Sequence, residues 1–205
     1  MKPKRAVEEH YYTEQPKSKP QLGLIRAHLR GRFLEFLTSS SIFSKRRVDL
    51  GTRLLIESMV LPEKGSVLDL GCGYGPVGIA AAVSNPNLHV VMVDVNTRAV
   101  WLAGENAKRN RVENVEIKRG FLYEPVENME FAAVLCNPPV SAGMKTVSSI
   151  ITDAPKHLRE NCSLQLVVRS RKGGKRLFGM LKETFGSVEV LAKESGYRVL
   201  LSKKS

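Results

Sequence analysis

The spacing of hydrophobic and polar positions divides the chain into two kinds of segment, one typical of strands and one typical of helices. From residue 66 onward, short apolar runs of strand length alternate with longer stretches whose apolar residues recur at helical spacing. The strand-like runs lie at 66–70, 89–95, 115–120, 131–137 and 163–170, and the helical stretches lie at 76–84, 97–110, 147–158 and 175–186. Strands that alternate with helices predict an α/β sandwich of the Rossmann-like type, with a mostly parallel sheet.

The two ends of the chain depart from this alternation. The segment 187–204 is typical of a hairpin that turns near Glu194-Ser195-Gly196, and it would complete a seven-stranded sheet with an antiparallel pair. Near the other end, 22–38 predicts two short strands that meet at Arg30-Gly31. A polar arm with three prolines precedes them, so we expect residues 1–40 to form a small appendage and 41–205 the main domain.

Prolines and glycines mark further boundaries. A loop that begins at Ser39 leads to a helix predicted from about Thr52 to Met59. Pro76 suits the first turn of the helix that follows the first regular strand. Pro155 indicates a break or kink in the stretch 147–158, because proline removes a helical hydrogen bond. We expect Trp101 to face the core or the sheet.

The composition is that of a soluble globular protein. The chain has 205 residues, of which 42% are hydrophobic and 25% charged, and this suits one domain with a proper core. No apolar run approaches the roughly 20 residues needed to cross a bilayer, and the charged N-terminus lacks the apolar centre of a secretion signal. We therefore expect a cytoplasmic location and no membrane partner.

Three cysteines, Cys72, Cys136 and Cys162, lie in or beside apolar segments. They lack the spacing of a metal site, and the four histidines are scattered. The sequence predicts buried free thiols and no bound metal.

Positive charge gathers at both ends of the chain. The net charge is +12, with a balance of +6 in residues 1–50, −2 in 51–155 and +8 in 156–205. Such clustering is expected of a protein that binds a phosphate backbone, although a well-solvated basic surface gives the same pattern. A basic run beyond the strand 163–170 is a candidate for RNA contact, and it contains Arg169, Arg171, Lys172, Lys175 and Arg176.

The loop DLGCGYG, from Asp69 to Gly75, joins the first regular strand to the next helix. That context is typical of a nucleotide-binding loop, but Pro76 stands where a dinucleotide fingerprint has its third glycine. A carboxylate at Asp69 would repel a pyrophosphate and attract an ammonium or a sulfonium group. S-adenosylmethionine carries both of these cations and no phosphate, so the loop favours this cofactor over NAD.

Asp94 ends the following strand, where an acidic side chain can accept hydrogen bonds from both ribose hydroxyls of a nucleoside. Asp69 and Asp94 would then lie at the tips of consecutive strands. The alternative is a set of tight-turn glycines beside a helix-capping aspartate. The residues expected to bind the cofactor are Asp69, Gly71, Cys72, Gly73, Gly75, Asp94, Val95, Asn96, Phe121 and Asn137.

The stretch VLCNPPVSAGM, at 134–144, ends a predicted buried strand with an asparagine and two prolines. The exocyclic amine of a base is a poor nucleophile because its lone pair is delocalised into the ring. The Asn137 side-chain oxygen and the Pro138 carbonyl could each accept one N–H and turn the lone pair toward an incoming methyl group. The prolines would hold these acceptors in place before the substrate arrives. The alternative is an ordinary turn, since Asn-Pro commonly starts one.

These motifs resemble those of the class I S-adenosylmethionine-dependent methyltransferases, within the amine-directed group that carries an NPP motif. The resemblance covers about residues 40–205. Three segments, 42–55, the NPP run with Gly143-Met144, and 183–203, are similar to the MTS domain of the small-subunit ribosomal RNA guanine-N2 methyltransferases and to their single-domain archaeal relatives. The resemblance implies methyl transfer to guanine N2 of ribosomal RNA, with Asn137 and Pro138 as the catalytic residues.

One residue departs from the family pattern. Val140 stands where the family has an aromatic ring that stacks on the target base, a contact worth about 1–3 kcal/mol per base. Phe43, Tyr11, Tyr12 and Phe121 are candidates to supply the missing ring. The resemblance also gives a set of substrate-binding candidates, which are Phe43, Ser44, Asp49, Thr52, Pro139 and Val140. The first four match a segment that closes over the methionine end of the cofactor and the substrate. The alternative for that segment is a loop in which Asp49 caps the following helix.

Other acceptors stay open. The NPP motif also serves methylation of glutamine side chains in proteins and of adenine N6, and the RNA could be tRNA instead of ribosomal RNA. A non-enzymatic alternative is a nucleic-acid-binding module that keeps the cofactor fold. Such a module would need none of Asp69, Asp94 and Asn137. The target nucleotide and the oligomeric state are not specified by these patterns.

Overall fold

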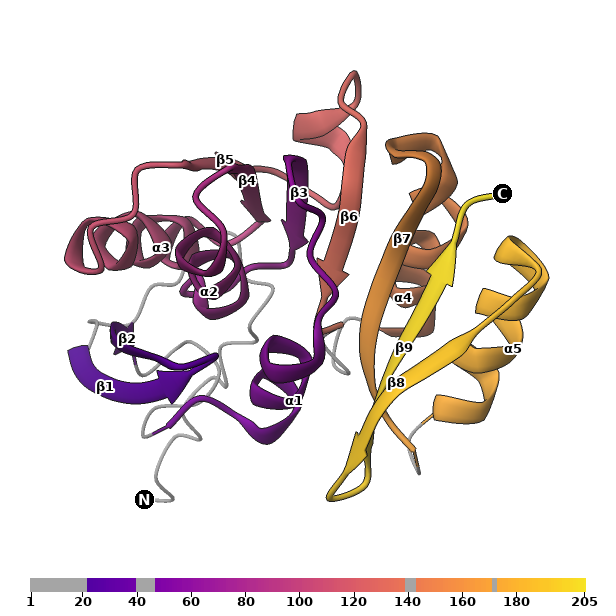
Figure 1. The fold of residues 1–205 in the computed structure, drawn as a ribbon, viewed down its shortest axis with the longest axis horizontal. Helices are drawn as coiled ribbons and strands as arrows, with labels where there is room; N and C mark the ends of the chain where they lie inside the picture. Colours follow the sequence, from indigo (N-terminus) through magenta and orange to yellow (C-terminus); the bar gives the residue numbers. More distant parts are fainter. Residues whose placement is uncertain (1–21, 40–46, 139–142, 171–172) are drawn as a thin grey trace, which may run out of the picture.

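The computed structural model describes residues 22–39, 47–138, 143–170 and 173–205, and its centre is a seven-stranded sheet (Figure 1). The order of the strands is β5-β4-β3-β6-β7-β9-β8. The strands from β3 to β7 run parallel, whereas β9 is antiparallel to both of its neighbours. These strands are β3 (Gly65–Leu70), β4 (Leu88–Asp94), β5 (Val115–Arg119), β6 (Phe131–Cys136), β7 (Leu158–Arg169), β8 (Glu189–Glu194) and β9 (Tyr197–Lys203). The Rossmann-like fold with a C-terminal hairpin is confirmed.

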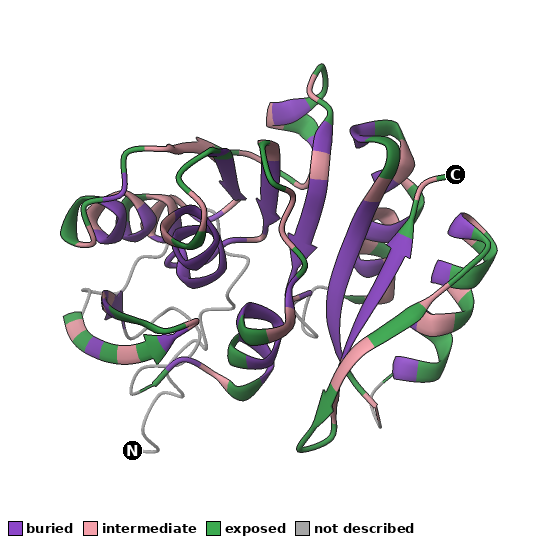
Figure 2. Cartoon of the chain, in the orientation of Figure 1, coloured by how far each residue is buried: buried purple, intermediate pink, exposed green. Residues whose placement is uncertain are grey.

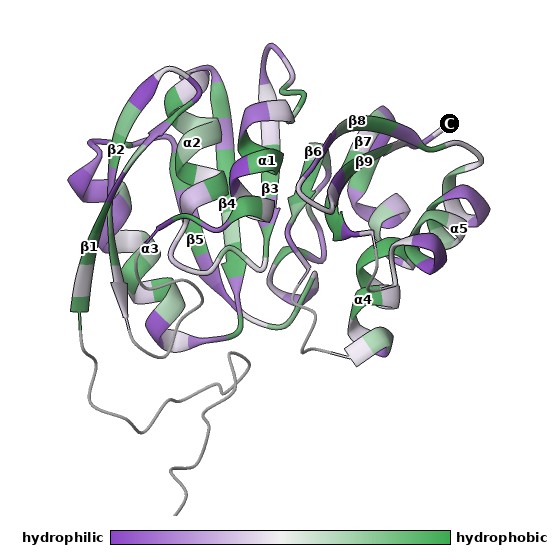
Figure 3. Cartoon of the chain, turned by 90° about the horizontal axis from the view of Figure 1, so that it is seen from below, coloured by the Kyte–Doolittle hydropathy of each residue, from purple (hydrophilic) through white to green (hydrophobic). Residues whose placement is uncertain are grey.

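Helices cover both faces of this sheet. The first face carries α1 (Leu50–Ser58), α2 (Pro76–Ser84) and α3 (Thr97–Arg109), and the second carries α4 (Gly143–Thr152) and α5 (Gly174–Phe185). Successive residues of a strand point to opposite faces, so Leu135 packs in the first core cluster and Val134 in the second. The central strands are therefore buried on both sides, as Figure 2 shows in purple and Figure 3 in green.

The strand order reverses between β3 and β6, because the chain builds outward through β4 and β5 before it crosses to β6. In α/β sheets, ligands bind at the carboxyl ends of the strands beside such a reversal. In Figure 1 the arrowheads of β3 and β6 point to the same edge of the sheet, and α1 and the tip of the β8–β9 hairpin lie at that edge. The fold therefore brings the glycine loop after β3 and the asparagine after β6 together.

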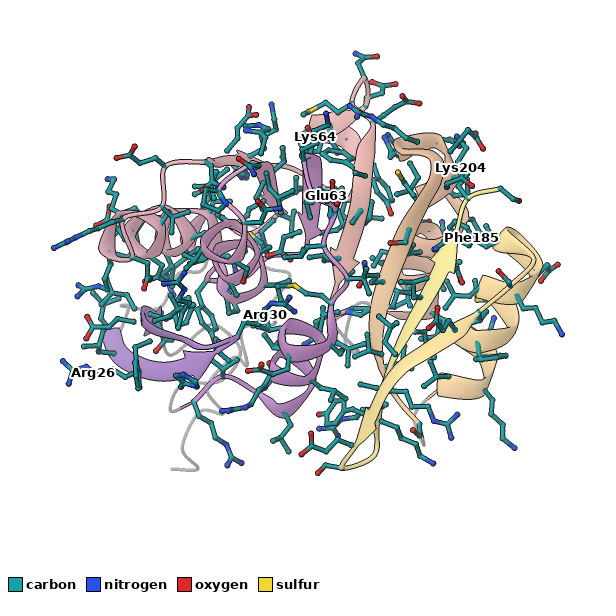
Figure 4. All side chains as sticks on the ribbon, viewed as in Figure 1. Arg26, Arg30, Glu63, Lys64, Phe185 and Lys204 are labelled. Atoms are coloured by element: carbon teal, nitrogen blue, oxygen red, sulfur yellow. The ribbon has the colours of Figure 1, made fainter. Side chains whose placement is uncertain are left out.

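The N-terminal strands β1 (Leu22–Leu29) and β2 (Arg32–Ser39) form a separate antiparallel hairpin, as predicted. Its turn residues have φ values of 44° at Arg30 and 75° at Gly31, and Gly31 adopts this left-handed conformation without strain. The Arg30 guanidinium donates to the carbonyls of Ile56 and Met59 at 3.0 and 3.1 Å, so it stabilises the last turn of α1. Figure 4 shows Arg30 beside α1, whereas Arg26 points outward from the hairpin.

Two asparagines, one in α3 and one at its C-cap, bind the outer edge of this hairpin. The Asn106 side chain accepts from the Leu37 N–H and donates to the Leu37 carbonyl, and Asn110 does the same with Glu35, at 2.6–3.0 Å. The two amides thus satisfy backbone groups that a neighbouring strand would otherwise satisfy. Asn106 also donates to the carbonyl of Tyr74 at 2.8 Å, so the hairpin supports the glycine loop.

Some predicted boundaries were wrong. α1 begins at Leu50, two residues early, because Asp49 caps it. The stretch 147–158 breaks near Pro155 as predicted, but its end is a 3₁₀ turn (Ala154–His157), and β7 begins at Leu158.

Trp101 is 49% exposed, contrary to the prediction, because α3 turns Ala99, Leu102 and Ala103 toward the sheet and position 101 away from it.

The three cysteines are free, with Cys72 and Cys136 buried and Cys162 half-buried. In the part of the chain that the structure describes, no helix is long and apolar enough to cross a membrane. Within the same ranges, no cluster of three or more His, Cys, Asp or Glu side chains could hold a metal ion.

Candidate active site

The glycine loop between β3 and α2 is tied to the tip of β4. The backbone N–H groups of Gly71 and Cys72 both donate to the carbonyl of Val93, at 2.8 and 2.9 Å. The next N–H along the chain, that of Gly73, donates to the Asp94 carboxylate at 2.8 Å. Asp94 therefore shapes the loop as well as lying beside it, a role that the sequence reasoning missed.

Three glycines of this loop adopt positive φ, with 74° at Gly71, 59° at Gly73 and 90° at Gly75. These angles lie in the left-handed region that side chains rarely adopt. A Cβ at Gly75 would also come within 3.3 Å of the Ala103 Cβ on α3. A Cβ at Gly71 would meet no atom within 4 Å, so the loop presents bare backbone to open space on that side, as a site for a closely held ligand requires.

Asp69 lies at the end of β3 and is only 2% exposed. Its carboxylate accepts from the Gly78 N–H of α2 at 2.8 Å. A Cβ at Gly78 would lie 2.5 Å from the Met92 side chain, so glycine lets α2 approach this closely. Burial, and to a lesser degree the charge of Asp94, raise the pKa of Asp69 to about 7, although the Gly78 N–H opposes the change.

Asp94 is 3% exposed and holds two backbone donors, the N–H of Gly73 on one oxygen and that of Asn96 on the other at 2.9 Å. Asn96 in turn caps α3, since its side-chain oxygen accepts from the N–H groups of Arg98 and Ala99. A carboxylate has about four acceptor positions, and the sequence predicts that Asp94 also accepts from ribose hydroxyls. That contact stays a prediction.

A pocket opens beside Asp94 at the tips of β3 and β4. Four of the predicted cofactor residues, Gly71, Asp94, Val95 and Phe121, lie in its wall, and Phe121 is 42% exposed. The remaining wall is mostly apolar and is formed by Leu70, Val93, Gly120, Leu122, Thr146 and Ile150. Thr146 and Ile150 come from α4, whose contribution had no motif in the sequence to reveal it.

These features fit S-adenosylmethionine. Apolar walls with one carboxylate suit an adenosine, whose ring is flat and whose ribose carries two hydroxyl donors. Asp69 makes no ion pair among the described residues, and its carboxylate lies in the field of Asp94. A ligand with ammonium and sulfonium charges would offset this repulsion, whereas a pyrophosphate would add to it.

Asn137 follows β6 at the same edge of the sheet. Its side-chain nitrogen donates to the Thr52 hydroxyl of α1 at 2.8 Å, which leaves the amide oxygen as the group that can accept from a substrate. Thr52 is itself fixed, because the Asp49 carboxylate accepts from the N–H groups of Gly51 and Thr52 at 3.0 and 3.1 Å. The structure thus brings Asp49 and Thr52 to Asn137, and Pro138 behind it is buried.

A buried glutamine holds α1 against the sheet. Gln165 of β7 accepts from the Val60 N–H at 2.9 Å and donates to the Val60 carbonyl at 2.7 Å. With Arg30 at the same end of the helix, this pair fixes the position from which Thr52 reaches Asn137. Gln165 lies in the predicted strand 163–170, but its pattern gave no sign of this role.

Several predicted substrate residues, Phe43, Ser44, Pro139 and Val140, lie outside the described residues, as do Tyr11 and Tyr12. Phe121 follows β5, three strands away from β6, and lies in the wall of the pocket beside Asp94. Its role beside the cofactor stays a prediction.

Two cysteines lie beside the site. Burial, together with the charges of Asp69 and Asp94, raises the pKa of the Cys72 and Cys136 thiols well above their usual value. The thiolate is the reactive form of cysteine, so this direction does not favour either thiol as a nucleophile.

Comparison with known proteins agrees with this geometry. The family model of the methyltransferase small domain matches residues 33–201. The uncharacterized protein YbxB of Bacillus subtilis is 39% identical over 97% of this chain and 100% of its own length. Ribosomal RNA small subunit methyltransferase C of Aeromonas hydrophila is 32% identical over 83% of this chain, which spans only 49% of that relative.

A solved structure shows the same arrangement of elements. The 16S rRNA N2 methyltransferase RsmC of Thermus thermophilus, in complex with AdoMet and guanosine, superposes with a TM-score of 0.81 and 25% identity. The match covers 93% of this chain and 52% of that one. The chain belongs to the methyltransferase small domain family, and it is a methyltransferase that uses S-adenosylmethionine.

Proposed function

We propose that this chain methylates an exocyclic amine of RNA, with guanine N2 of small-subunit ribosomal RNA as the acceptor. The observation that carries the proposal is the Asn137–Thr52 hydrogen bond of 2.8 Å, because it commits the amide nitrogen and turns the amide oxygen into the available acceptor. An acceptor at this place is what an amine substrate needs. The similarity to ribosomal RNA methyltransferases supports the choice of RNA.

The residues of this chain account for the chemistry in three parts. Bound S-adenosylmethionine supplies a methyl group activated by a positively charged sulfur. Asp69 and Asp94 favour that charge, and the glycine loop lets the ligand approach the backbone. Asn137 Oδ1 and the Pro138 carbonyl accept the two N–H groups of the amine, which concentrates its lone pair on the side facing the methyl group.

The transfer needs no general base with a shifted pKa. The nitrogen–carbon bond forms as the carbon–sulfur bond breaks, the sulfur leaves as a neutral thioether, and the nitrogen becomes positively charged. The charged nitrogen is strongly acidic, so it loses one proton to water after the transfer. The contribution of the protein is orientation, since in-line attack requires the nitrogen about 3 Å from the methyl carbon.

The net charge of the chain supports RNA over a protein acceptor. Residues 1–50 and 156–205 carry balances of +6 and +8, and phosphate is the abundant anion of RNA. A glutamine side chain in another protein would gain nothing from this charge unless its surroundings were acidic. Adenine N6 offers an amine of the same kind, so the identity of the methylated nucleoside decides between them.

The test is methyl transfer from tritiated S-adenosylmethionine to separate pools from a strain without the gene. The pools are small ribosomal subunits, naked ribosomal RNA, tRNA and total protein, each with wild-type chain and with Asn137→Ala as the matched control. We expect label in N2-methylguanosine from small-subunit RNA with the wild type alone. Label in N6-methyladenosine, in tRNA or in protein would contradict the proposed acceptor, and transfer by Asn137→Ala at the normal rate would contradict the proposed role of the asparagine.

A further inference from the structure

Arg169, the last residue of β7, is held in one orientation by Tyr197, the first residue of β9. The register of the two strands places these residues directly opposite each other. The Arg169 Nε–H donates to the Tyr197 hydroxyl at 2.8 Å, and the guanidinium carbon lies 5.0 Å from the centre of the tyrosine ring. A hydrogen bond and a cation–π contact together fix a side chain that otherwise is exposed.

The backbone around this pair is equally constrained. The Ser170 N–H donates to the Gly196 carbonyl at 2.8 Å, which ties the end of β7 to the β8–β9 turn. A Cβ at Gly174 would lie 2.8 Å from the Arg169 carbonyl, and a Cβ at Gly51 would lie 2.9 Å from the Tyr197 ring. Glycine at both positions allows these close contacts, so neighbouring elements fix the positions of Arg169 and Tyr197.

The pair lies beside the acceptor side of the active site. Gly51, on which the Tyr197 ring rests, directly precedes Thr52, the partner of Asn137. Arg169 is on the same face of the sheet as Val167, which packs in the cluster that contains Leu135 of β6. Extending the β6–β7 register places the Cα of Arg169 roughly 8 Å from that of Asn137, one strand across and two residues along.

Arg169 has no acidic partner in the described ranges. Arg26, by contrast, pairs with Glu35 at 2.7 Å. Arg53 and Arg159 are also exposed and make no ion pair in these ranges, so Arg169 is set apart by its orientation on Tyr197. Only the Nε–H of Arg169 takes part in a hydrogen bond there, so the two terminal nitrogens of the guanidinium keep their donors. A planar, fixed and uncompensated guanidinium is the group that binds phosphate through two parallel hydrogen bonds.

We propose that Arg169, oriented by Tyr197, binds a backbone phosphate next to the nucleotide whose amine reaches Asn137. This inference rests on the proposed function, in that an RNA strand must enter the site. Arg169 is then a residue that positions the substrate.

The experiment measures affinity for small-subunit ribosomal RNA from the strain without the gene, over a series of salt concentrations. Arg169→Gln is compared with Arg159→Gln, which changes an exposed arginine at the opposite end of the same strand. We expect Arg169→Gln to weaken binding about 10-fold and to reduce the slope of log affinity against log salt by about 0.7–0.9, the value for one lost phosphate contact. Arg159→Gln should leave both quantities unchanged.

Two further variants separate the phosphate contact from a structural role. Tyr197→Phe removes the hydroxyl that accepts from Arg169 and keeps the ring, and it should weaken RNA binding less than Arg169→Gln does. Arg169→Lys keeps the charge and loses the planar pair of donors, and it should retain most of the salt slope. Calorimetry with S-adenosylmethionine checks the fold of each variant, and its affinity should not change. With saturating RNA, kcat should stay within about twofold of the wild type, because the loss lies in binding.

An equal salt slope and an equal KM for RNA in Arg169→Gln and Arg159→Gln would overturn the phosphate contact while leaving the methyltransferase activity intact. Failure of the proposed function would give a different result. If the wild type binds RNA with the expected salt slope but transfers no methyl group to it, the proposed function falls and the Arg169 contact stands.

Discussion

The two sides of the active site are held by different kinds of contact. At the tips of β3 and β4, the carboxylates of Asp69 and Asp94 are 2% and 3% exposed and accept from backbone N–H groups, Asp69 from the first turn of α2 and Asp94 from the loops on either side of it. At the tips of β6 and β7, Asn137 is half-buried and Arg169 exposed, and each is held through one side chain of another element. The side chains of the cofactor side thus also hold the backbone in place, whereas those of the acceptor side make only side-chain contacts.

Because of this difference, substitutions on the two sides should affect stability and turnover differently. Removing a carboxylate on the cofactor side leaves buried backbone donors without partners, so stability and cofactor affinity should fall together. Removing a side chain on the acceptor side leaves no buried backbone group unsatisfied, so turnover should fall while the fold persists. A cofactor site that is fixed in the fold can serve several acceptors, because the acceptor residues change at little cost in stability.

The largest effect is expected on the acceptor side. Asn137→Ala should lower kcat by about 10²–10³-fold, since removal of one group that stabilises developing charge costs that much. S-adenosylmethionine affinity and the melting temperature should stay near those of the wild type. Methyl transfer to RNA and calorimetry measure these, and Asn87→Ala, which changes an exposed asparagine, is the control. A parallel loss of cofactor binding would show that the two sides are not separable.

On the cofactor side, Asp94→Ala should change two quantities at once. The substitution leaves the N–H groups of Gly73 and Asn96 without an acceptor, so the free energy of unfolding should fall by about 2 kcal/mol or more. Cofactor affinity should fall at least about tenfold, because a buried hydrogen-bonding group is worth that much. Urea unfolding and calorimetry test this, with the exposed Glu127→Ala as control. Loss of affinity with unchanged stability would contradict the structural role of Asp94.

A smaller effect on turnover is expected from Thr52→Val. Valine has nearly the shape of threonine but cannot accept from Asn137, so the amide would rotate among several orientations. We expect kcat to fall about 10-fold with little change in KM or stability, since misplacement of a reacting group reduces turnover. Thr52→Ser keeps the hydroxyl and should recover most of the activity. Equal losses in the serine and valine variants would show that packing, and not the hydrogen bond, is what matters.

Stability should also depend on pH. Folding raises the pKa of Asp69 from 3.8 to about 7, so between these values the folded protein holds a proton that the unfolded chain has lost. The free energy of unfolding of the cofactor-free protein should therefore decrease as the pH rises from about 4 to 7. Asp69→Asn should make this dependence shallower, and a bound cation should reduce it because it favours the ionised carboxylate.

Thermal unfolding at pH 5, 6 and 7, with and without S-adenosylmethionine, measures this prediction. A wild-type curve no steeper than that of Asp69→Asn would contradict the raised pKa. A cofactor affinity that decreases as the pH rises through 7 would contradict attraction between Asp69 and the cationic ligand.

The sequence predicted the layers of the fold and the edge of the sheet that carries the site. Period, strand length and the glycine loop are local signals, so the positions of Asp69, Asp94 and Asn137 at strand ends could be inferred from them. The sequence also showed that Val140 stands where the family has an aromatic ring, but it did not decide which candidate supplies that ring. Phe121, one of these candidates, lies in the wall of the pocket beside Asp94.

The contacts that the sequence did not reveal join residues far apart in the chain. Gln165 binds Val60, Asn106 binds the backbone of β2, and Arg169 meets Tyr197, none of which belongs to a motif. Such pairs can be recognised only when the sheet order and the helix positions are known, because the sequence around a polar side chain does not indicate its partner. The same reason explains Trp101, whose exposed face follows from the rotation of α3.

The central claim is that buried carboxylates at the tips of β3 and β4 hold a cationic methyl donor facing Asn137. The most direct test is a crystal structure of the chain grown with S-adenosylmethionine. We expect the ribose at Asp94, the charged methionine end nearer Asp69, and the methyl group directed at the space in front of the Asn137 amide oxygen. A donor bound away from these strand tips, or with its methyl group turned away from Asn137, would contradict the account.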